Sequence, residues 1–364
     1  MVNSAPYLMP AEWEPHRAVW LAWPHDEISF PGPHLAGTKS AIAKIISAIH
    51  QTEQVELLVV DEPMQREAAA ALKAAGVALE KITFRQTSYM DAWMRDCGPI
   101  FVKDRTGNLS LVKWIFNMWG NKFPDLLPDD QLPYRLRDWL GLAMREPQLV
   151  LEGGAIDVNG QGLCLTTEQC LLNENRNGGK TKKDIEQFLA ENLGISKTIW
   201  LWKGLMHDHT DGHVDEIARF IGPNRVVCAY DDDPASENYA ILKNNYETLC
   251  AATDQDGQPL EVIKLPMPHL RYDQDKPFEQ GEVAPVSYTN FYIGNGMVLA
   301  AVFSDPNDQK ALDILKSCFP GRQVVPIDCT DIIYGGGAIH CITQQEPGAS
   351  VKREVQSAQG EAGD

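Results

Sequence analysis

The sequence lacks the features that define several large protein classes. Its eight cysteines include no Cys-x-x-Cys pair and are scattered from Cys97 to Cys341, which fits neither a zinc ribbon nor a small disulfide scaffold. No apolar run could span a bilayer, since even Met297 to Phe303 is far too short. The first residues lack the basic start and apolar stretch of a secretory signal. We therefore expect a cytoplasmic protein with reduced thiols and no membrane partner.

Positive charge is scarce as well. The 364 residues include 50 acids against 32 bases, a formal net charge of −18 at pH 7. This balance argues against nucleic acid as a partner, whereas a negative potential around a cleft attracts a small cation. Hydrophobic content of 44% and charged content of 23% are those of an ordinary globular protein. The length allows two domains, or one large domain with internal repetition.

Helical and strand patterns alternate along the chain. Apolar residues at helical spacing predict helices over 37–51, 64–75, 183–193, 237–248 and 309–318. Short apolar runs predict strands over 18–24, 55–60, 82–84, 225–230, 261–265 and 324–327, with a hairpin over 287–303. This alternation indicates an α/β protein built from several comparable units, although no exact sequence repeat is visible.

A candidate nucleophile lies near the end of the chain. Three glycines, Gly335 to Gly337, precede Cys341 and allow a turn that could present the thiol into a cleft. A thiol reacts only as its thiolate, so a nucleophilic role needs a group that removes the proton. The alternative is a buried structural cysteine that follows a strand turn.

Acidic residues at three other places could hold a cation. Asp96 is predicted on a tight connection ended by Gly98-Pro99, with Trp93 as an aromatic wall. The alternative for Asp96 is an ion pair with Arg95 that fixes the loop. Glu152 follows the apolar run 149–151, a predicted strand, and we expect the Gly-Gly turn after it to expose its side chain.

The third acidic stretch contains both an imidazole and a carboxylate. His213 and Asp215 are two residues apart on a predicted strand, which would place both side chains on one face. The alternative is an exposed acidic loop. A second alternative is a metal site, because His207, His209, Asp211 and His213 are similar to the His-x-His-x-Asp-His string of zinc hydrolases. Here the last histidine comes one position late.

Together these stretches resemble a known family. The motifs are Met94-Arg95-Asp96-x-Gly98-Pro99, Glu152-Gly153-Gly154, Thr210-Asp211-Gly212-His213-Val214-Asp215 and Gly335-Gly336-Gly337-x-Ile339-His340-Cys341. In this order they resemble the agmatine deiminases and the bacterial-type peptidylarginine deiminases. The resemblance implies a pentein fold, a pseudo-fivefold α/β propeller with the active site in its central channel. It implies one catalytic domain over 1–349, and we expect the polar tail 350–364 to be disordered.

The resemblance also implies a role for each candidate residue. Asp96 and Asp215 would bind the guanidinium, and Cys341 would attack its carbon to form an amidino-cysteine (thiouronium) intermediate. His213 would protonate the departing ammonia and then activate water, while Glu152 would orient His213. The family needs no cofactor or metal and suggests a homo-oligomer in putrescine and polyamine metabolism. Three carboxylates near the thiol would raise its pKa until a cationic substrate arrives.

The sequence leaves the substrate open between agmatine and arginine or peptidylarginine. Asp211 and Glu216 stand where agmatine deiminases often carry Asn, which affects only the amine end of the pocket. The absence of a signal and of an attached domain favours free agmatine, which would give N-carbamoylputrescine and ammonia. A protein of another class, which binds guanidino compounds without turnover, remains an alternative.

Overall fold

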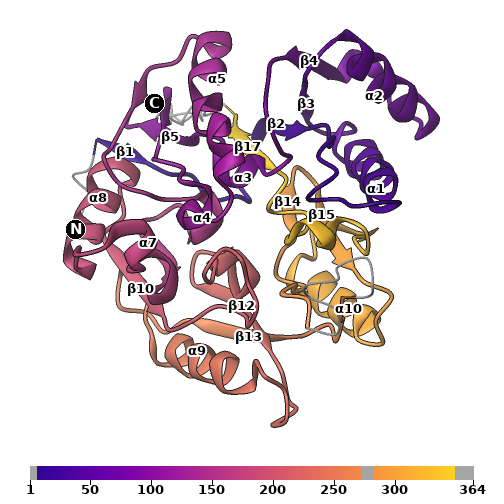
Figure 1. Cartoon of the computed structure of the whole chain (residues 1–364). Helices are drawn as coiled ribbons and strands as arrows, with labels where there is room; N and C mark the ends of the chain where they lie inside the picture. Colours follow the sequence, from indigo (N-terminus) through magenta and orange to yellow (C-terminus); the bar gives the residue numbers. More distant parts are fainter. Residues whose placement is uncertain (1–5, 273–282, 349–364) are drawn as a thin grey trace, which may run out of the picture.

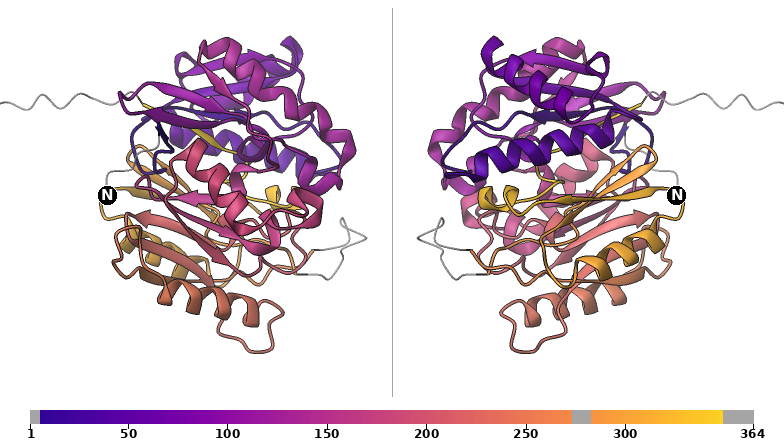
Figure 2. Two further views of the ribbon diagram at one scale, coloured as in Figure 1. Left: turned by 90° about the vertical axis from the view of Figure 1, so that its left-hand side faces the viewer. Right: turned by 90° about the vertical axis from the view of Figure 1, so that its right-hand side faces the viewer.

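The structure is a computed structural model that describes residues 6–272 and 283–348. Five separate sheets surround a common centre, and helices lie around the outside (Figure 1). In the right-hand view of Figure 2, the indigo helix α1 (His34–Ile49) crosses the near surface and the orange helix α10 (Asp308–Cys318) lies below it. The predicted fivefold α/β architecture is confirmed. The predicted disordered tail, 350–364, lies outside the described residues.

Each sheet is built on one plan. Two antiparallel strands are followed by one or more helices and by a strand that returns parallel to the second. One unit consists of β11 (Ala218–Gly222), β12 (Arg225–Tyr230), α9 (Tyr239–Ala251) and β13 (Glu261–Pro266). The next consists of β14 (Tyr292–Gly294), β15 (Met297–Val302), α10 and β16 (Gln323–Asp328).

Two further units follow the plan with longer connections. One contains β5 (Ile100–Asp104), β6 (Leu109–Val112), α5 (Leu132–Leu140) and β7 (Met144–Arg145), with β1 (Tyr7–Leu8) beside β5. The other contains β8 (Ile156–Val158), β9 (Leu163–Thr167), α8 (Lys182–Leu193) and β10 (Lys197–Leu201).

The fifth unit combines both ends of the chain. The last strand, β17 (Gln344–Pro347), pairs antiparallel with β2 (His16–Ala22), so that Gln344 lies opposite Trp20. Parallel strands β3 (Gln54–Val59) and β4 (Ile82–Gln86) complete this sheet, with α1 and α2 (Glu62–Ala74) as its connections. The ring of units is therefore closed by a strand from the end of the sequence.

Local sequence explains the long elements. In α1, Ile42, Ile45, Ile46 and Ile49 recur at helical spacing and all four are fully buried. The helix α8 begins with a capping box between Thr181 and Asp184, and it ends at Gly194, whose φ of 71° is left-handed. The predicted helices and long strands are confirmed, with bounds that shift by a few residues.

Three predicted local structures are wrong. The run 149–151 contains only an isolated bridge between Val150 and Ile115 instead of a strand. The first strand of the predicted hairpin begins only at Tyr292, because 287–290 form a turn in which the Asn290 N–H donates to the Ser287 carbonyl. Residues 214–216 form a 3₁₀ turn, so that His213 and Asp215 do not lie on a strand.

Apolar packing covers most of each sheet. The buried apolar side chains form three clusters, the largest of which joins α1 and the sheet of β2 to the sheet of β14. All eight cysteines lie within the described residues and none is in a disulfide. In the described part of the chain, no helix is both long enough and apolar enough to cross a membrane.

A fully buried arginine links distant parts of the ring. Arg219 in β11 donates to Asp157 Oδ1 at 2.9 Å, to Glu12 Oε2 at 2.9 Å and to the Phe291 carbonyl at 2.8 Å. These partners come from three other segments of the chain. A buried cation with its counterions already in place is costly to remove, because the remaining anions would stay desolvated and uncompensated.

We expect Arg219→Met to lower the free energy of unfolding by about 3–5 kcal/mol, because it leaves two buried carboxylates without their shared cation. The matched control is Arg225→Met in the adjacent strand, since the Arg225 pair with Glu261 is partly exposed. An exposed pair of this kind contributes about 0–1 kcal/mol. Denaturant unfolding of both variants measures the difference, and equal losses would contradict the prediction.

Candidate active site

Each of the five units contributes to one site from the same structural position, the segment just before the first strand of its antiparallel pair. Asp96 lies in α3 (Met94–Cys97) before β5, and Glu152 precedes the 3₁₀ turn 153–155 that leads into β8. His213 directly precedes the 3₁₀ turn 214–216 that leads into β11, and Asp215 lies within that turn. The last two units contribute Asn290, just before β14, and Cys341, just before β17. The repeated plan therefore gathers side chains that are far apart in sequence.

Gly154 marks the point where three of these side chains meet. A Cβ atom at this glycine would lie 2.5 Å from His213 Nδ1 and 3.0 Å from both Asp215 Oδ2 and Asp96 Oδ1. The Gly154 N–H also donates to Asp96 Oδ1 at 3.0 Å. Gly154 is therefore needed for close approach. Glu152, just before it, is fully buried, so the expectation that the Gly-Gly turn exposes its side chain is wrong.

Cys341 lies beside this group. Its Sγ atom is 3.8 Å from Asp215 Oδ2 and 3.9 Å from Glu216 Oε1, and it accepts a hydrogen bond from Asn290 Nδ2 at 3.1 Å. Gly336 adopts a left-handed φ of 96°. A Cβ atom at Gly337 would lie 2.9 Å from the Cys341 sulfur. The glycine loop therefore makes room for the thiol, as the sequence suggests.

In the empty site, the thiol of Cys341 keeps its proton, which disfavours nucleophilic attack. Burial and the nearby carboxylates of Asp215, Glu216 and Asp96 raise the pKa of Cys341 well above its usual value. The three carboxylates predicted near the thiol are Asp96, Asp215 and Glu152. In the structure, Glu216 lies there in place of Glu152. Cys341 is a neutral thiol near pH 7, since deprotonation would place a further negative charge in a buried cluster of acids.

Two hydrogen-bond donors fix Asp96, and the ring of His213 lies 3.7 Å from its Oδ1. Trp119 Nε1 donates to its Oδ2 at 2.9 Å, and the Gly154 amide holds Oδ1. Burial raises the pKa of Asp96, which His213 partly opposes. The predicted alternative, an ion pair with Arg95, does not form: Arg95 turns away and donates to Gln344 and Gln345.

His213 is buried among anions without a direct hydrogen bond from either ring nitrogen. Its Nδ1 is 3.7 Å from Asp96 Oδ1 and its Nε2 is 3.9 Å from Glu152 Oε2. Burial opposes the charged imidazole, but Asp96, Cys170 and Glu152 together hold the pKa of His213 well above its usual value. The ring is therefore a cation at neutral pH.

Two buried acid–base contacts support the His213 loop. Glu152 Oε1 accepts from Arg176 Nε at 2.6 Å, and Arg176 Nη1 also donates to Asp211 Oδ2 at 2.9 Å. Thr167 Oγ1 donates to the Gly212 carbonyl at 2.6 Å. The loop is thus fixed by neighbouring segments, and the alternative of an exposed acidic loop does not hold for His213 and Asp215, which are at most 1% exposed.

A pocket of about 520 Å³ is lined by Asp96 and Cys341, but not by His213, Asp215 or Glu152. Trp93 and Trp119 form its aromatic walls, and Asp96 and Cys341 lie at its inner end. Trp93 is held by a 2.7 Å hydrogen bond from its Nε1 to Asp91. Phe123 is partly exposed among the lining residues. A larger surface groove of about 900 Å³, beside α1 and β16, contains none of the candidate residues.

The sequence missed three residues of this site. Trp119 belongs to the motif Phe116-Asn117-x-Trp119-Gly120, which could have signalled it. Glu216 was noticed only as a difference at the amine end, yet one of its buried carboxylate oxygens, Oε2, has no hydrogen-bond partner. Asn290 has no local signal, because it lies in a stretch that was assigned to a strand.

The predicted zinc alternative does not match the geometry. His207 contacts Glu237 at 2.9 Å, and Asp211 is paired with Lys122 and Arg176. Within the described residues, two groups have donor atoms close enough for a metal: Glu152 with Cys170 and His213, and Asp215 with Glu216 and Cys341. Neither includes His207, His209 or Asp211, so the four residues of the string do not form one centre.

Known proteins share this architecture over nearly the whole chain. An agmatine deiminase of Stutzerimonas stutzeri is 38% identical over 370 residues, which cover 95% of this chain and 97% of that protein. The structure of the Enterococcus faecalis agmatine deiminase has a TM-score of 0.86 at 34% identity and covers 95% and 98% of the two chains. A C. jejuni agmatine deiminase variant with substrate bound has a TM-score of 0.82 at 27% identity, with coverage of 94% and 97%.

The family comparison extends over the same region. The sequence model of the Porphyromonas-type peptidyl-arginine deiminase family matches residues 8–347, which include every residue of the site described above. The chain therefore belongs to the Porphyromonas-type peptidyl-arginine deiminase family.

Proposed function

We propose that this chain hydrolyses the guanidinium group of agmatine to N-carbamoylputrescine and ammonia, a step in putrescine and polyamine metabolism. The observation that carries the proposal is the meeting of Asp96, His213 and Asp215 at Gly154, with the Cys341 sulfur 3.8 Å from Asp215. The agmatine deiminases that this chain resembles over nearly its full length support the choice of reaction.

Binding comes first in the proposed mechanism. A guanidinium is planar and permanently cationic, so it needs anions that accept its N–H groups in pairs. Asp96 and Asp215 are the acceptors, and Asp215 Oδ1 is buried without another partner. The indole faces of Trp93 and Trp119 line the approach and attract the cation.

The covalent step uses the thiol beside these acids. The Cys341 thiolate attacks the guanidinium carbon and forms an S–C bond, giving a tetrahedral adduct. His213, cationic at rest, gives its proton to the leaving nitrogen, and the C–N bond breaks to release ammonia. The product of this half-reaction is an amidino-cysteine, a thiouronium cation that Asp96 and Asp215 still hold.

Hydrolysis then reverses the roles. His213, now neutral, removes a proton from water, whose oxygen attacks the thiouronium carbon. The C–S bond then breaks, and the hydroxyl proton of the adduct passes to the leaving sulfur, which restores the thiol. The remaining group is the ureido end of N-carbamoylputrescine. Glu152 acts as a positioning residue, because its negative charge favours the protonated form of His213 and its other oxygen is fixed by Arg176.

Substrate binding supplies the thiolate. In the empty site the acids keep the proton on Cys341, as described above. A bound guanidinium neutralises those acids and lies close to the sulfur, so it lowers the pKa of the thiol. The reactive anion therefore forms only when a cationic substrate is present, which protects the thiol between turnovers.

The pocket favours agmatine over arginine. Among the described residues that line it, Lys122 is the only lysine or arginine. Lys122 Nζ is 2.7 Å from Asp211 Oδ1 and donates to the His209 carbonyl at 2.7 Å, so it is already paired. The α-carboxylate of arginine would lose its hydration there without gaining a free cation.

The rest of the proposal concerns the form and place of the enzyme. We infer one catalytic domain over 1–349, acting in the cytoplasm on a small cationic substrate, without a cofactor, in a homo-oligomer. Five units that each contribute to one site support a single domain. A free arginine or peptidylarginine substrate is the alternative that the pocket charges disfavour.

We expect Cys341→Ala to lower ammonia release from agmatine by about 10⁴-fold or more, because no other group can form the covalent intermediate. Cys250→Ala removes an exposed thiol away from the site and should leave the rate unchanged. A native chain that binds agmatine without releasing ammonia would instead identify a binding protein.

The thiolate of Cys341 should appear at lower pH when a guanidinium ligand is bound. We expect an alkylguanidinium that is not hydrolysed to move the titration midpoint down by about 1–3 pH units. The readout is ultraviolet thiolate absorbance, with the Cys341→Ser variant subtracted as the control for the other cysteines. An unchanged midpoint at saturating ligand would argue against substrate-assisted ionisation.

Agmatine should exceed arginine in kcat/KM by about 100-fold, because the carboxylate would be desolvated without a partner. Arginine amide keeps the bulk of arginine without the carboxylate charge, so it separates size from charge and should fall between the two. Initial rates of ammonia release measure all three. Equal values for agmatine and arginine would favour the alternative substrate.

A further inference from the structure

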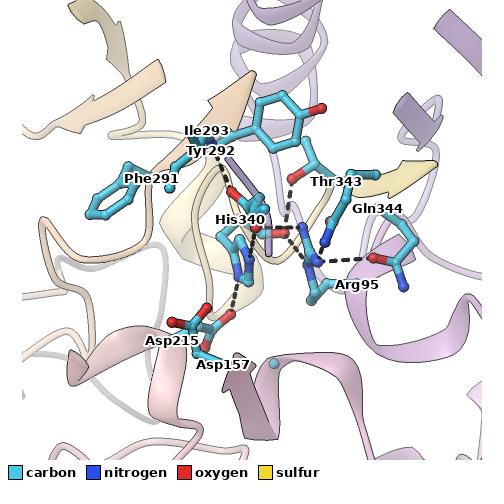
Figure 3. Close-up of polar contacts among 12 residues, drawn as sticks. Arg95, Asp157, Asp215, Phe291, Tyr292, Ile293, His340, Thr343 and Gln344 are labelled. Atoms are coloured by element: carbon cyan, nitrogen blue, oxygen red, sulfur yellow. Dashed lines mark hydrogen bonds and ion pairs between the residues drawn. The ribbon is translucent and has the colours of Figure 1, made fainter. Parts of the chain in front are cut away.

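His340, just before the nucleophile, lies between two carboxylates. Its Nδ1 is 2.7 Å from Asp215 Oδ2 and its Nε2 is 2.8 Å from Glu12 Oε2, and the ring is 2% exposed (Figure 3). A neutral imidazole has only one N–H and would direct a lone pair at one of these oxygens. With both carboxylates ionised, the two contacts are attractive together only when both nitrogens carry hydrogen, so the geometry favours an imidazolium.

The charges around the ring lead to the same assignment. Glu12 is held by Arg219 at 2.9 Å, by the Ile293 N–H at 2.7 Å and by Arg95 at 3.5 Å. Arg219 also holds Asp157. The cluster thus contains three carboxylates, Glu12, Asp157 and Asp215, against two guanidinium groups, Arg95 and Arg219. It is electrically balanced only when His340 carries the third positive charge.

Two neighbouring acids show the effect of this contact. Asp215 and Glu216 are almost equally close to the Cys341 sulfur, but only Asp215 touches His340. Burial disfavours its charge, yet the His340 hydrogen bond lowers the pKa of Asp215. Burial and the Asp215 charge raise the pKa of Glu216 well above its usual value. The contact with His340 therefore favours the ionised form of Asp215, whereas the surroundings of Glu216 favour its neutral form.

We propose that His340 is a positioning residue that makes Asp215, and not Glu216, the anion that binds the guanidinium. The imidazolium holds Asp215 Oδ2 and leaves Oδ1 to accept an N–H from the substrate. Glu12 holds the other side of the ring and so fixes its orientation and charge. The inference rests on the proposed function, because it assigns a role within the same guanidinium site.

The test compares two ligands of the same shape that differ in the charge of the group held by Asp96 and Asp215. Agmatine has a guanidinium where N-carbamoylputrescine has an uncharged ureido group. In a Cys341→Ser background, which prevents turnover, calorimetry gives the dissociation constant of each ligand. In the His340→Gln variant, the side-chain amide nitrogen lies as many bonds from Cα as Nε2 does in histidine. The glutamine can therefore reach Glu12, but it cannot replace the contact to Asp215.

The expected result is a selective loss. His340→Gln should weaken agmatine binding by about 10- to 100-fold, the size of a lost charge-assisted hydrogen bond, and leave N-carbamoylputrescine within about 3-fold. His340→Asn, whose amide nitrogen matches Nδ1, keeps a neutral donor to Asp215 and should lose about 3- to 10-fold for agmatine alone. The asparagine variant decides the question if the glutamine variant does not fold.

Thr343→Val is the matched control, because Thr343 Oγ1 donates to the His340 and Ile339 carbonyls and does not touch Asp215. Any disturbance of the loop there should affect both ligands equally. Equal weakening of both ligands in the His340 variants, or native agmatine binding in them, would overturn the inference. Failure of the Cys341→Ser variant to bind agmatine with His340 intact would instead refute the proposed function.

Discussion

The antiparallel pairing of β17 with β2 determines where the reactive sulfur lies. Cys341 directly precedes β17, and its carbonyl accepts a hydrogen bond from the Arg95 N–H at 3.1 Å, so the pairing fixes it against the segment that carries Asp96. Without this strand, four units would still carry their side chains, but the fifth position would be empty. The chemistry therefore depends on a contact between the two ends of the fold.

The second constraint is electrostatic. Several acids converge in an interior with little water, and each needs a cation or a proton. The three acids are treated differently: Asp215 contacts the ring of His340, Glu152 is paired with the guanidinium of Arg176, and burial together with the Asp215 charge raises the pKa of Glu216. Because their partners differ, these carboxylates have different roles, although the sequence alone does not distinguish them. Among the described residues, the buried carboxylates that keep an oxygen without a hydrogen-bond partner are Glu152, Asp215 and Glu216, all of them in the site.

Local sequence patterns predicted the parts of the fold that depend on local forces. The isoleucines of α1 and the capping box of α8 are visible in any window of the sequence, and both helices form as expected. The turn before β8 was predicted from its Gly-Gly pair, but the turns before β11 and β14 were missed, because two or three residues give no periodic signal. Their conformation depends on contacts made by other segments, as Gly154 shows with its three neighbours.

The candidate residues followed the same division. Asp96, Glu152, His213, Asp215 and Cys341 stood out because glycine turns or clustered charges surround them. Asn290 and Glu12 stood in ordinary stretches, and only the fold shows that one touches the sulfur and the other touches His340. The burial of Glu152 was also invisible, since its partner Arg176 lies in another part of the sequence.

Ring closure by the final strand also affects synthesis of the protein. On the ribosome β2 emerges among the first strands, while its partner β17 and the cysteine before it emerge last. One edge of β2 therefore stays unpaired until β17 has been synthesised, and such edges are prone to aggregation. A nascent or truncated chain that lacks β17 and Cys341 also cannot modify guanidino metabolites, because the nucleophile is synthesised together with the strand that completes the ring.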